Sequence, residues 1–175
     1  RVLFRSDVLN IFPSQVVLRA DERQTVNVEY NGTSPDEREQ AFRVIASQIP
    51  VDFEDDEASE TSGGVNFTLT YETALYVTPS ADTSPDVAVD EIELAGDEFL
   101  VTVSNSGTRR AILRDAELEL LTSEGETISV LEGESLGRLN GMNLLAGYTV
   151  TVRLPRTDEL QNDTTPDSAQ IRYSD

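Results

Sequence analysis

Apolar and polar side chains alternate with a period of two along most of this 175-residue chain, which is the pattern of β-strands. The clearest case is VNFTLTYETALYV, residues 65–77, which is longer than the roughly 3–10 residues of most strands. One face of this segment carries Val65, Phe67, Leu69, Tyr71, Thr73, Leu75 and Val77. The sequence therefore predicts one long strand with a mostly apolar row on one side.

Three earlier segments also predict strands. The segment LNIFPSQVVL, residues 9–18, predicts a strand, a bend at Pro13 and a second strand. Residues 24–30, QTVNVEY, alternate in the same way as the long strand. Residues 41–49, AFRVIASQI, form a mostly apolar run, which is expected of a strand buried on both faces.

Two polar segments separate these strands from each other and from the rest of the chain. Residues 52–64, DFEDDEASETSGG, predict a solvated acidic loop, and they lack the ligand pattern of an EF-hand calcium site. Residues 80–85, SADTSP, are small and polar and end in proline, so they predict a linker between two domains.

The second half of the chain predicts a β-sandwich, because short alternating segments are separated by turns rich in Asn, Gly and Asp. Residues 145–155, LAGYTVTVRLP, predict a turn that leads into an alternating strand. Residues 111–121, AILRDAELELL, have the propensity for a helix but lack a clear helix cap, and we interpret them as a strand.

The charge of the chain excludes two classes of partner. It contains 33 acidic and 13 basic residues and has a net charge of −20. Nucleic acids and anionic membrane surfaces attract basic proteins, so we expect neither as a partner. Because no run reaches the roughly 18 apolar residues of a membrane span, we expect no membrane insertion.

Missing residue types exclude much of the chemistry of enzymes. The chain has no His, Cys or Lys. It therefore lacks Ser-His and Cys-His nucleophile pairs, ordinary zinc sites and a Schiff-base lysine, and we expect no metal, cofactor or catalytic residue. A glycosidase with paired carboxylates stays open in principle, but nothing in the sequence places two carboxylates on rigid neighbouring elements.

Three pieces of the chain together carry a family pattern, namely DVLNIFPSQVVLRADERQTVNVEY (7–30), DEREQAFRVIASQIPV (36–51) and GGVNFTLTYETALYVTP (63–79). In this order they resemble the periplasmic chaperones of chaperone–usher pilus assembly, the PapD-like family. A looser similarity follows in the segments from Leu100 to Gly107 and from Gly147 to Val150. Their order and spacing and the long alternating strand carry this resemblance.

The resemblance implies an all-β fold with two immunoglobulin-like β-sandwich domains, the first incomplete at its N-terminus. Residues 7–79 would be the C-terminal part of the first domain, 80–85 the linker and 86–175 the second domain. Residues 1–6, RVLFRS, are expected to be non-native, because their back-translation CGT GTG CTC TTC CGA TCT reproduces the end of a common sequencing adapter.

The family resemblance also implies a function in the periplasm. Such a chaperone binds and caps pilus or fimbrial subunits by donor-strand complementation, lending a strand to a sandwich that lacks one, and delivers them to an outer-membrane usher. The lent strand would carry the row Val65, Phe67, Leu69 and Tyr71, which we call the donor row. From alternation alone, packing of this row in the domain's own core is the better interpretation, and only the resemblance reverses that preference.

One position departs from the family pattern. Much of the family has a Lys on the long strand that holds the carboxylate at the C-terminus of the subunit, whereas the matching residue here is Ala74. Arg43 is the candidate replacement, because a guanidinium binds a carboxylate through two hydrogen bonds. Alternatively, Arg43 reaches a sheet edge or pairs with a loop carboxylate, or the protein lacks assembly activity.

A second class of function fits the composition equally well. The chain could be a tandem immunoglobulin-like structural module of a bacterial cell-surface protein. That alternative predicts that residues 65–71 are buried within their own domain, whereas the chaperone hypothesis predicts that the donor row is exposed.

Overall fold

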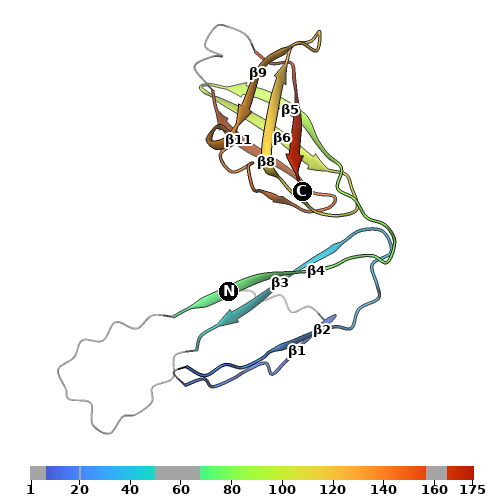
Figure 1. Ribbon diagram of the computed structural model, residues 1–175, viewed down its shortest axis with the longest axis vertical. Coiled ribbons are helices and arrows are strands. Elements are labelled where there is room, and N and C mark those ends of the chain that lie inside the picture. The colour runs from blue at the N-terminus through green and yellow to red at the C-terminus, as the bar shows by residue number, and fades with distance from the viewer. Residues whose placement is uncertain (1–6, 20, 50–67, 157–164) are drawn as a thin grey trace, which may run out of the picture. The chain divides into compact units, whose positions relative to one another are not determined.

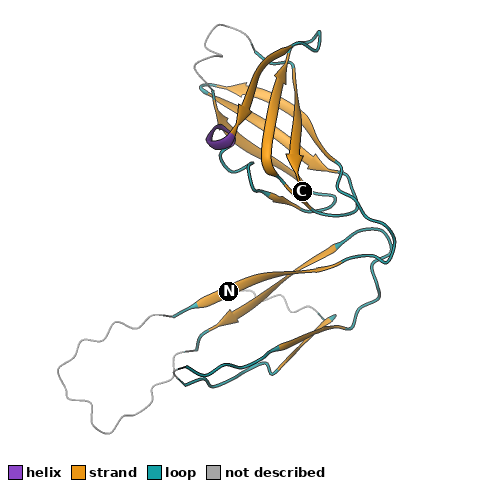
Figure 2. Cartoon of the chain, viewed as in Figure 1, coloured by secondary structure: helices purple, strands orange, loops and turns teal. Residues whose placement is uncertain are grey.

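The computed structural model describes residues 7–19, 21–49, 68–156 and 165–175. Among these residues the regular structure consists of β-strands and one short 3₁₀ helix, as Figure 2 shows. The predicted all-β class is therefore confirmed. The chain divides into two compact units, Arg1–Ser34 and Pro35–Asp175, which are described separately below.

The first unit contains one antiparallel hairpin. Strand β1 (Leu9–Phe12) pairs with β2 (Asn27–Tyr30), and Leu9 lies opposite Tyr30. The prediction of a second strand directly after Pro13 is wrong. Residues 14–18 form no strand and their apolar side chains are exposed, because β1 takes its backbone partner from residues 27–30 instead.

The second unit begins with a two-stranded antiparallel sheet. Strand β3 (Gln40–Ser47) pairs with β4 (Thr70–Val77), and Gln40 lies opposite Val77 (Figure 1). The expectation that residues 41–49 are buried on both faces is wrong, since Ile45 is 40% and Ile49 is 63% exposed. Within the described part of the chain this sheet has only two strands. A sheet this narrow leaves many of its side chains in contact with solvent.

The remainder of the second unit is a β-sandwich, the layered body in Figure 1. One sheet has the strand order β11 (Thr149–Pro155), β6 (Glu98–Asn105), β5 (Val87–Ala95). The other has the order β12 (Ser168–Ser174), β8 (Arg114–Leu121), β9 (Thr127–Glu132). The short strands β7 (Ala111–Ile112) and β10 (Asn143–Leu144) pair with each other, and η1 (Gly133–Leu136) follows β9.

The core of the sandwich follows from the alternation of its strands. On β6 the side chains of Phe99, Val101 and Val103 are buried, while the residues between them are only half-buried. They pack with buried leucines that include Leu118 and Leu120 on β8. The predicted sandwich is therefore confirmed, and residues 111–121 form strands, as interpreted from the sequence.

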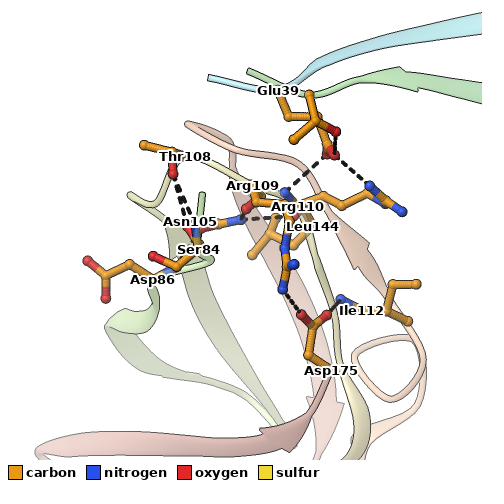
Figure 3. Close-up of polar contacts among 11 residues, drawn as sticks. Glu39, Ser84, Asp86, Asn105, Thr108, Arg109, Arg110, Ile112, Leu144 and Asp175 are labelled. Carbon is orange, nitrogen blue, oxygen red and sulfur yellow. Dashed lines mark hydrogen bonds and ion pairs between the residues drawn. The ribbon is translucent and has the colours of Figure 1, made fainter. Parts of the chain in front are cut away.

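A buried amide joins three segments at one end of the sandwich. Asn105 is 1% exposed, and its side-chain oxygen accepts hydrogen bonds from the backbone N–H groups of Asp86, at 3.0 Å, and Gly107, at 3.1 Å. Its side-chain NH₂ donates to the carbonyls of Arg109, at 2.9 Å, and Leu144, at 3.0 Å, as Figure 3 shows in part. Two acceptor and two donor positions are the full capacity of an asparagine amide.

The end of the predicted linker lies against this same corner. A Cβ atom added to Gly107 would stand 2.4–2.7 Å from backbone atoms of residues 84–86, so only glycine fits there. Thr108 also donates its backbone N–H to the carbonyl of Ser84 at 2.8 Å. Residues 84–86 are therefore held on the sandwich by backbone contacts, while the predicted domain boundaries stay a prediction.

Candidate functional site

The two faces of the β3–β4 sheet carry different chemistry. Residues that lie opposite each other in an antiparallel pair point to the same face. The register therefore gathers on one face, which we call the Tyr71 face, the side chains of Phe42, Val44, Ala46, Leu69, Tyr71, Thr73, Leu75 and Val77. The other face, the Arg43 face, carries Arg43, Ile45, Glu72, Ala74 and Tyr76.

Exposure changes along the Tyr71 face. Leu69 is 52% and Tyr71 is 68% exposed, whereas Leu75 and Val77 are half-buried. Leu69 belongs to the same ladder although it precedes β4, because its carbonyl accepts the backbone N–H of Gln48 at 2.8 Å. The described half of the donor row is thus open to a partner, while Val65 and Phe67 lie outside the described residues.

Strand β4 also has one free edge, since β3 is its only strand partner in the described part of the chain. Opposed residues in an antiparallel ladder alternate between hydrogen-bonded and non-hydrogen-bonded pairs. The bond between Gln48 and Leu69 fixes that alternation. It follows that Thr70, Glu72 and Ala74 point their backbone N–H and C=O groups toward the free edge, where a further strand can pair with them.

Arg43 lies directly opposite Ala74. This is the position at which much of the family that the chain resembles has a Lys. Its Nη1 atom is 3.0 Å from Oε2 of Glu72, and the two side chains are 71% and 47% exposed. The partner of Arg43 is therefore a carboxylate of the neighbouring strand, not of a loop. An ion pair this exposed contributes only about 0–1 kcal/mol, so an incoming carboxylate can compete for the guanidinium.

A buried ion pair holds the start of β3 against the sandwich (Figure 3). The side chain of Glu39 is 2% exposed, and its carboxylate lies 2.6 Å from the Arg110 guanidinium and accepts the backbone N–H of Arg110 at 3.2 Å. The Arg110 guanidinium stacks 3.8 Å from the centroid of the Tyr76 ring, a cation–π contact. The hydroxyl of Tyr76 accepts a hydrogen bond from Asn143 at 2.5 Å.

Sequence reasoning missed this cluster. Glu39 and Arg110 are separated by 71 positions, and a single sequence gives no signal that joins them. The one available hint was the rarity of basic residues, which makes the pair Arg109–Arg110 unusual in so acidic a chain.

Two shallow clefts lie beside the Glu39–Arg110 pair. One, of about 350 Å³, is lined by residues 39–42 with Leu145, Ala146 and Tyr148. The other, of about 430 Å³, includes Arg114 and the pair of Arg109 with Asp175, whose charged atoms are 2.5 Å apart. Nearby, burial raises the pKa of the Tyr173 hydroxyl above its ordinary value, and the Asp175 and Asp86 carboxylates raise it further.

The described residues offer no site for a metal and no membrane-spanning helix. No group of three or more His, Cys, Asp or Glu side chains among them is arranged to hold a metal ion. None of their helical structure is long and apolar enough to cross a membrane.

Comparisons with known proteins bear on both halves of the chain. Residues 5–82 match the family model for the pili and flagellar-assembly chaperone, PapD N-terminal domain. The chain is also similar to one from a solved structure described as "Chaperone-tip adhesin complex is vital for synergistic activation of CFA/I fimbriae biogenesis", with 12% identity and a TM-score of 0.51. That match covers 95% of this chain and 72% of the other, and at this identity it shows the fold alone. A comparison with curated protein sequences gave no match.

The Glu39–Arg110 pair should be essential for the stability of the second unit. Arg110→Met removes the guanidinium but leaves a buried carboxylate, and we expect the free energy of unfolding to fall by about 3–5 kcal/mol. The control Arg153→Met breaks the exposed pair with Glu98 and should lower it by no more than about 1 kcal/mol. Urea unfolding followed by circular dichroism measures both, and equal losses would contradict this role of Arg110.

Proposed function

We propose that this chain is a pilus-assembly chaperone of the PapD-like family, whose N-terminal domain model residues 5–82 match, and that it binds fimbrial subunits by lending them strand β4. The observation that carries the proposal is the state of β4. Its edge is free in the described part of the chain, and beside that edge Leu69 and Tyr71 are largely exposed. A strand with a free edge and an exposed apolar row can complete a sandwich that lacks one strand.

The lent strand would bind through two kinds of contact. The backbone groups of Thr70, Glu72 and Ala74 at the free edge would pair with a strand of the subunit. Leu69 and Tyr71, with Val65 and Phe67, would fill the groove left by the missing strand. Each apolar side chain buried there would contribute about 1.5–3 kcal/mol.

Arg43 is proposed as the anchor for the carboxylate at the C-terminus of the subunit. It lies opposite Ala74 in a non-hydrogen-bonded pair, in which the two side chains approach most closely. A long side chain at position 43 can therefore reach the space beside position 74. The exposure of Arg43 supports this role, because a subunit can reach its guanidinium.

The match of residues 5–82 to the family model supports the rest of the proposal. We propose that the protein works in the periplasm and passes its subunits to an outer-membrane usher. We also propose that it is not an enzyme, since a chain without His, Cys or Lys lacks most of the groups that enzymes use as nucleophiles and bases. The alternative of a structural module predicts that residues 65–71 are buried in their own domain, and the exposure of Leu69 and Tyr71 favours the chaperone.

A charge in the donor row should abolish subunit capture. Leu69→Asp and Phe67→Asp would each place a carboxylate in an apolar groove, and we expect capture to be lost. The loss of one buried apolar side chain alone would weaken binding by about tenfold or more, and an unpaired buried charge costs more than that. Co-purification with a co-expressed pilus subunit measures capture, and circular dichroism checks the fold. The control Thr70→Asp adds the same charge on the Arg43 face. Normal capture by both donor-row variants would refute the donated strand.

The anchor is tested by removing either partner of the proposed ion pair. Arg43→Gln should weaken binding of a subunit roughly tenfold, the value of a charge-assisted hydrogen bond at a partly exposed site. Amidation of the subunit's C-terminus should weaken binding to the unmodified chaperone by the same factor. It should not weaken binding to the Arg43→Gln variant any further, because the ion pair is already absent there. Arg153→Gln removes another exposed, paired arginine and serves as the control. Additive losses from the two changes would show that Arg43 does not hold that carboxylate.

A further inference from the structure

The excess of negative charge is far larger than solubility requires. A net charge of about 2–8 in magnitude is enough to keep a small domain soluble, whereas this chain has −20. All 13 basic residues are arginines. In the described part of the chain, Arg43, Arg109, Arg110, Arg153 and Arg172 form ion pairs, with Glu72, Asp175, Glu39, Glu98 and Glu119 respectively. The composition alone leaves 20 carboxylates without a matching cation.

One pair of like charges is built directly into a sheet. Glu117 on β8 lies opposite Glu132 on β9, both are exposed, and opposed residues share a face. Like charges directly opposite each other destabilise a sheet. Arg172 on β12 lies opposite Glu117 from the other side, but its guanidinium bonds to Glu119 at 2.9 Å. No ion pair among the described residues neutralises Glu117 or Glu132.

The turn between these two strands adds more negative charge to the same sheet. Glu124 and Glu126 flank Gly125, whose φ of 80° makes it the turn glycine. Beside them Asp167 accepts the backbone N–H of Ser123 at 2.9 Å. The sheet β12-β8-β9 therefore has carboxylates both across its exposed face and at its end.

Dissolved salt weakens repulsion of this kind. The screening length falls from about 10 Å at 0.1 M to about 3 Å at 1 M ionic strength. High net charge keeps a protein soluble but destabilises its compact state by self-repulsion. Strong screening should therefore favour the folded state of a chain with this charge and with carboxylates opposed within a sheet.

We propose that this protein is built to fold and function in a medium of high ionic strength. Dissolved cations there would screen the repulsion among its carboxylates, including that between the opposed Glu117 and Glu132. The proposal does not depend on the chaperone function or on any partner. The competing explanation is that the acidic residues serve solubility alone, in which case stability should not depend on screening.

Thermal unfolding of the full chain, followed by circular dichroism, tests the proposal. Between about 0.05 M and about 2 M NaCl we expect Tm to rise by about 5 °C or more. A chain that is unfolded in low salt and folds when NaCl is added would support the proposal equally. A Tm that is unchanged or lower in NaCl, or a chain that stays unfolded at every salt concentration, would overturn it.

A matched pair of variants separates the local repulsion from net charge. Glu132→Arg places a cation opposite Glu117 and should raise Tm in low salt by about 2–4 °C, with little effect in high salt. Glu134→Arg makes the same change of charge in η1, outside the β8–β9 ladder, and should raise Tm less. Equal shifts would overturn the assignment to Glu117 and Glu132. If Glu132→Arg does not fold, Glu132→Gln tests the same repulsion with a smaller expected shift.

Discussion

The pairing of Glu39 with Arg110 is the interaction on which the arrangement of the second unit depends. A carboxylate that is 2% exposed is stable only when its charge is compensated, and Arg110 provides both a guanidinium and a backbone N–H. The same guanidinium covers the ring of Tyr76, so a single side chain contacts the start of β3 and the end of β4. The β3–β4 sheet is thereby attached to the sandwich at the end where its side chains are most buried.

This attachment explains how β4 can be ordered and yet incompletely satisfied. At its C-terminal end Leu75 and Val77 are half-buried, and Tyr76 contacts Arg110. At its N-terminal end Leu69 and Tyr71 remain exposed beside a free edge. A strand that is held at one end and open at the other is suited to donation, because its conformation is set before a partner arrives. The match of residues 5–82 to the family model for the N-terminal domain of pilus-assembly chaperones fits this physical description.

The sequence predicts features that depend on the local alternation of side chains. It does not predict strand pairing, burial or polar contacts that depend on residues far away in the chain. Alternation correctly predicted β4 and β11, and the interpretation of residues 111–121 as a strand is confirmed by β7 and β8. The predictions of a strand after Pro13 and of burial on both faces of residues 41–49 are wrong, because strand pairing and burial depend on partners that the local pattern does not identify. The hydrogen bonds of Asn105 and the Glu39–Arg110 pair join residues far apart in the chain. The subunit-binding roles of the donor row and Arg43 stay predictions.

Amide hydrogen exchange on β4 tests the central claim most directly, because it detects backbone pairing itself. In the free protein the N–H groups of Thr70, Glu72 and Ala74 face the free edge and should exchange rapidly. In a complex with a pilus subunit we predict that their exchange slows by about tenfold or more, since a strand of the subunit then occupies that edge. Unchanged exchange at all three positions, while a subunit is demonstrably bound, would contradict the donated strand.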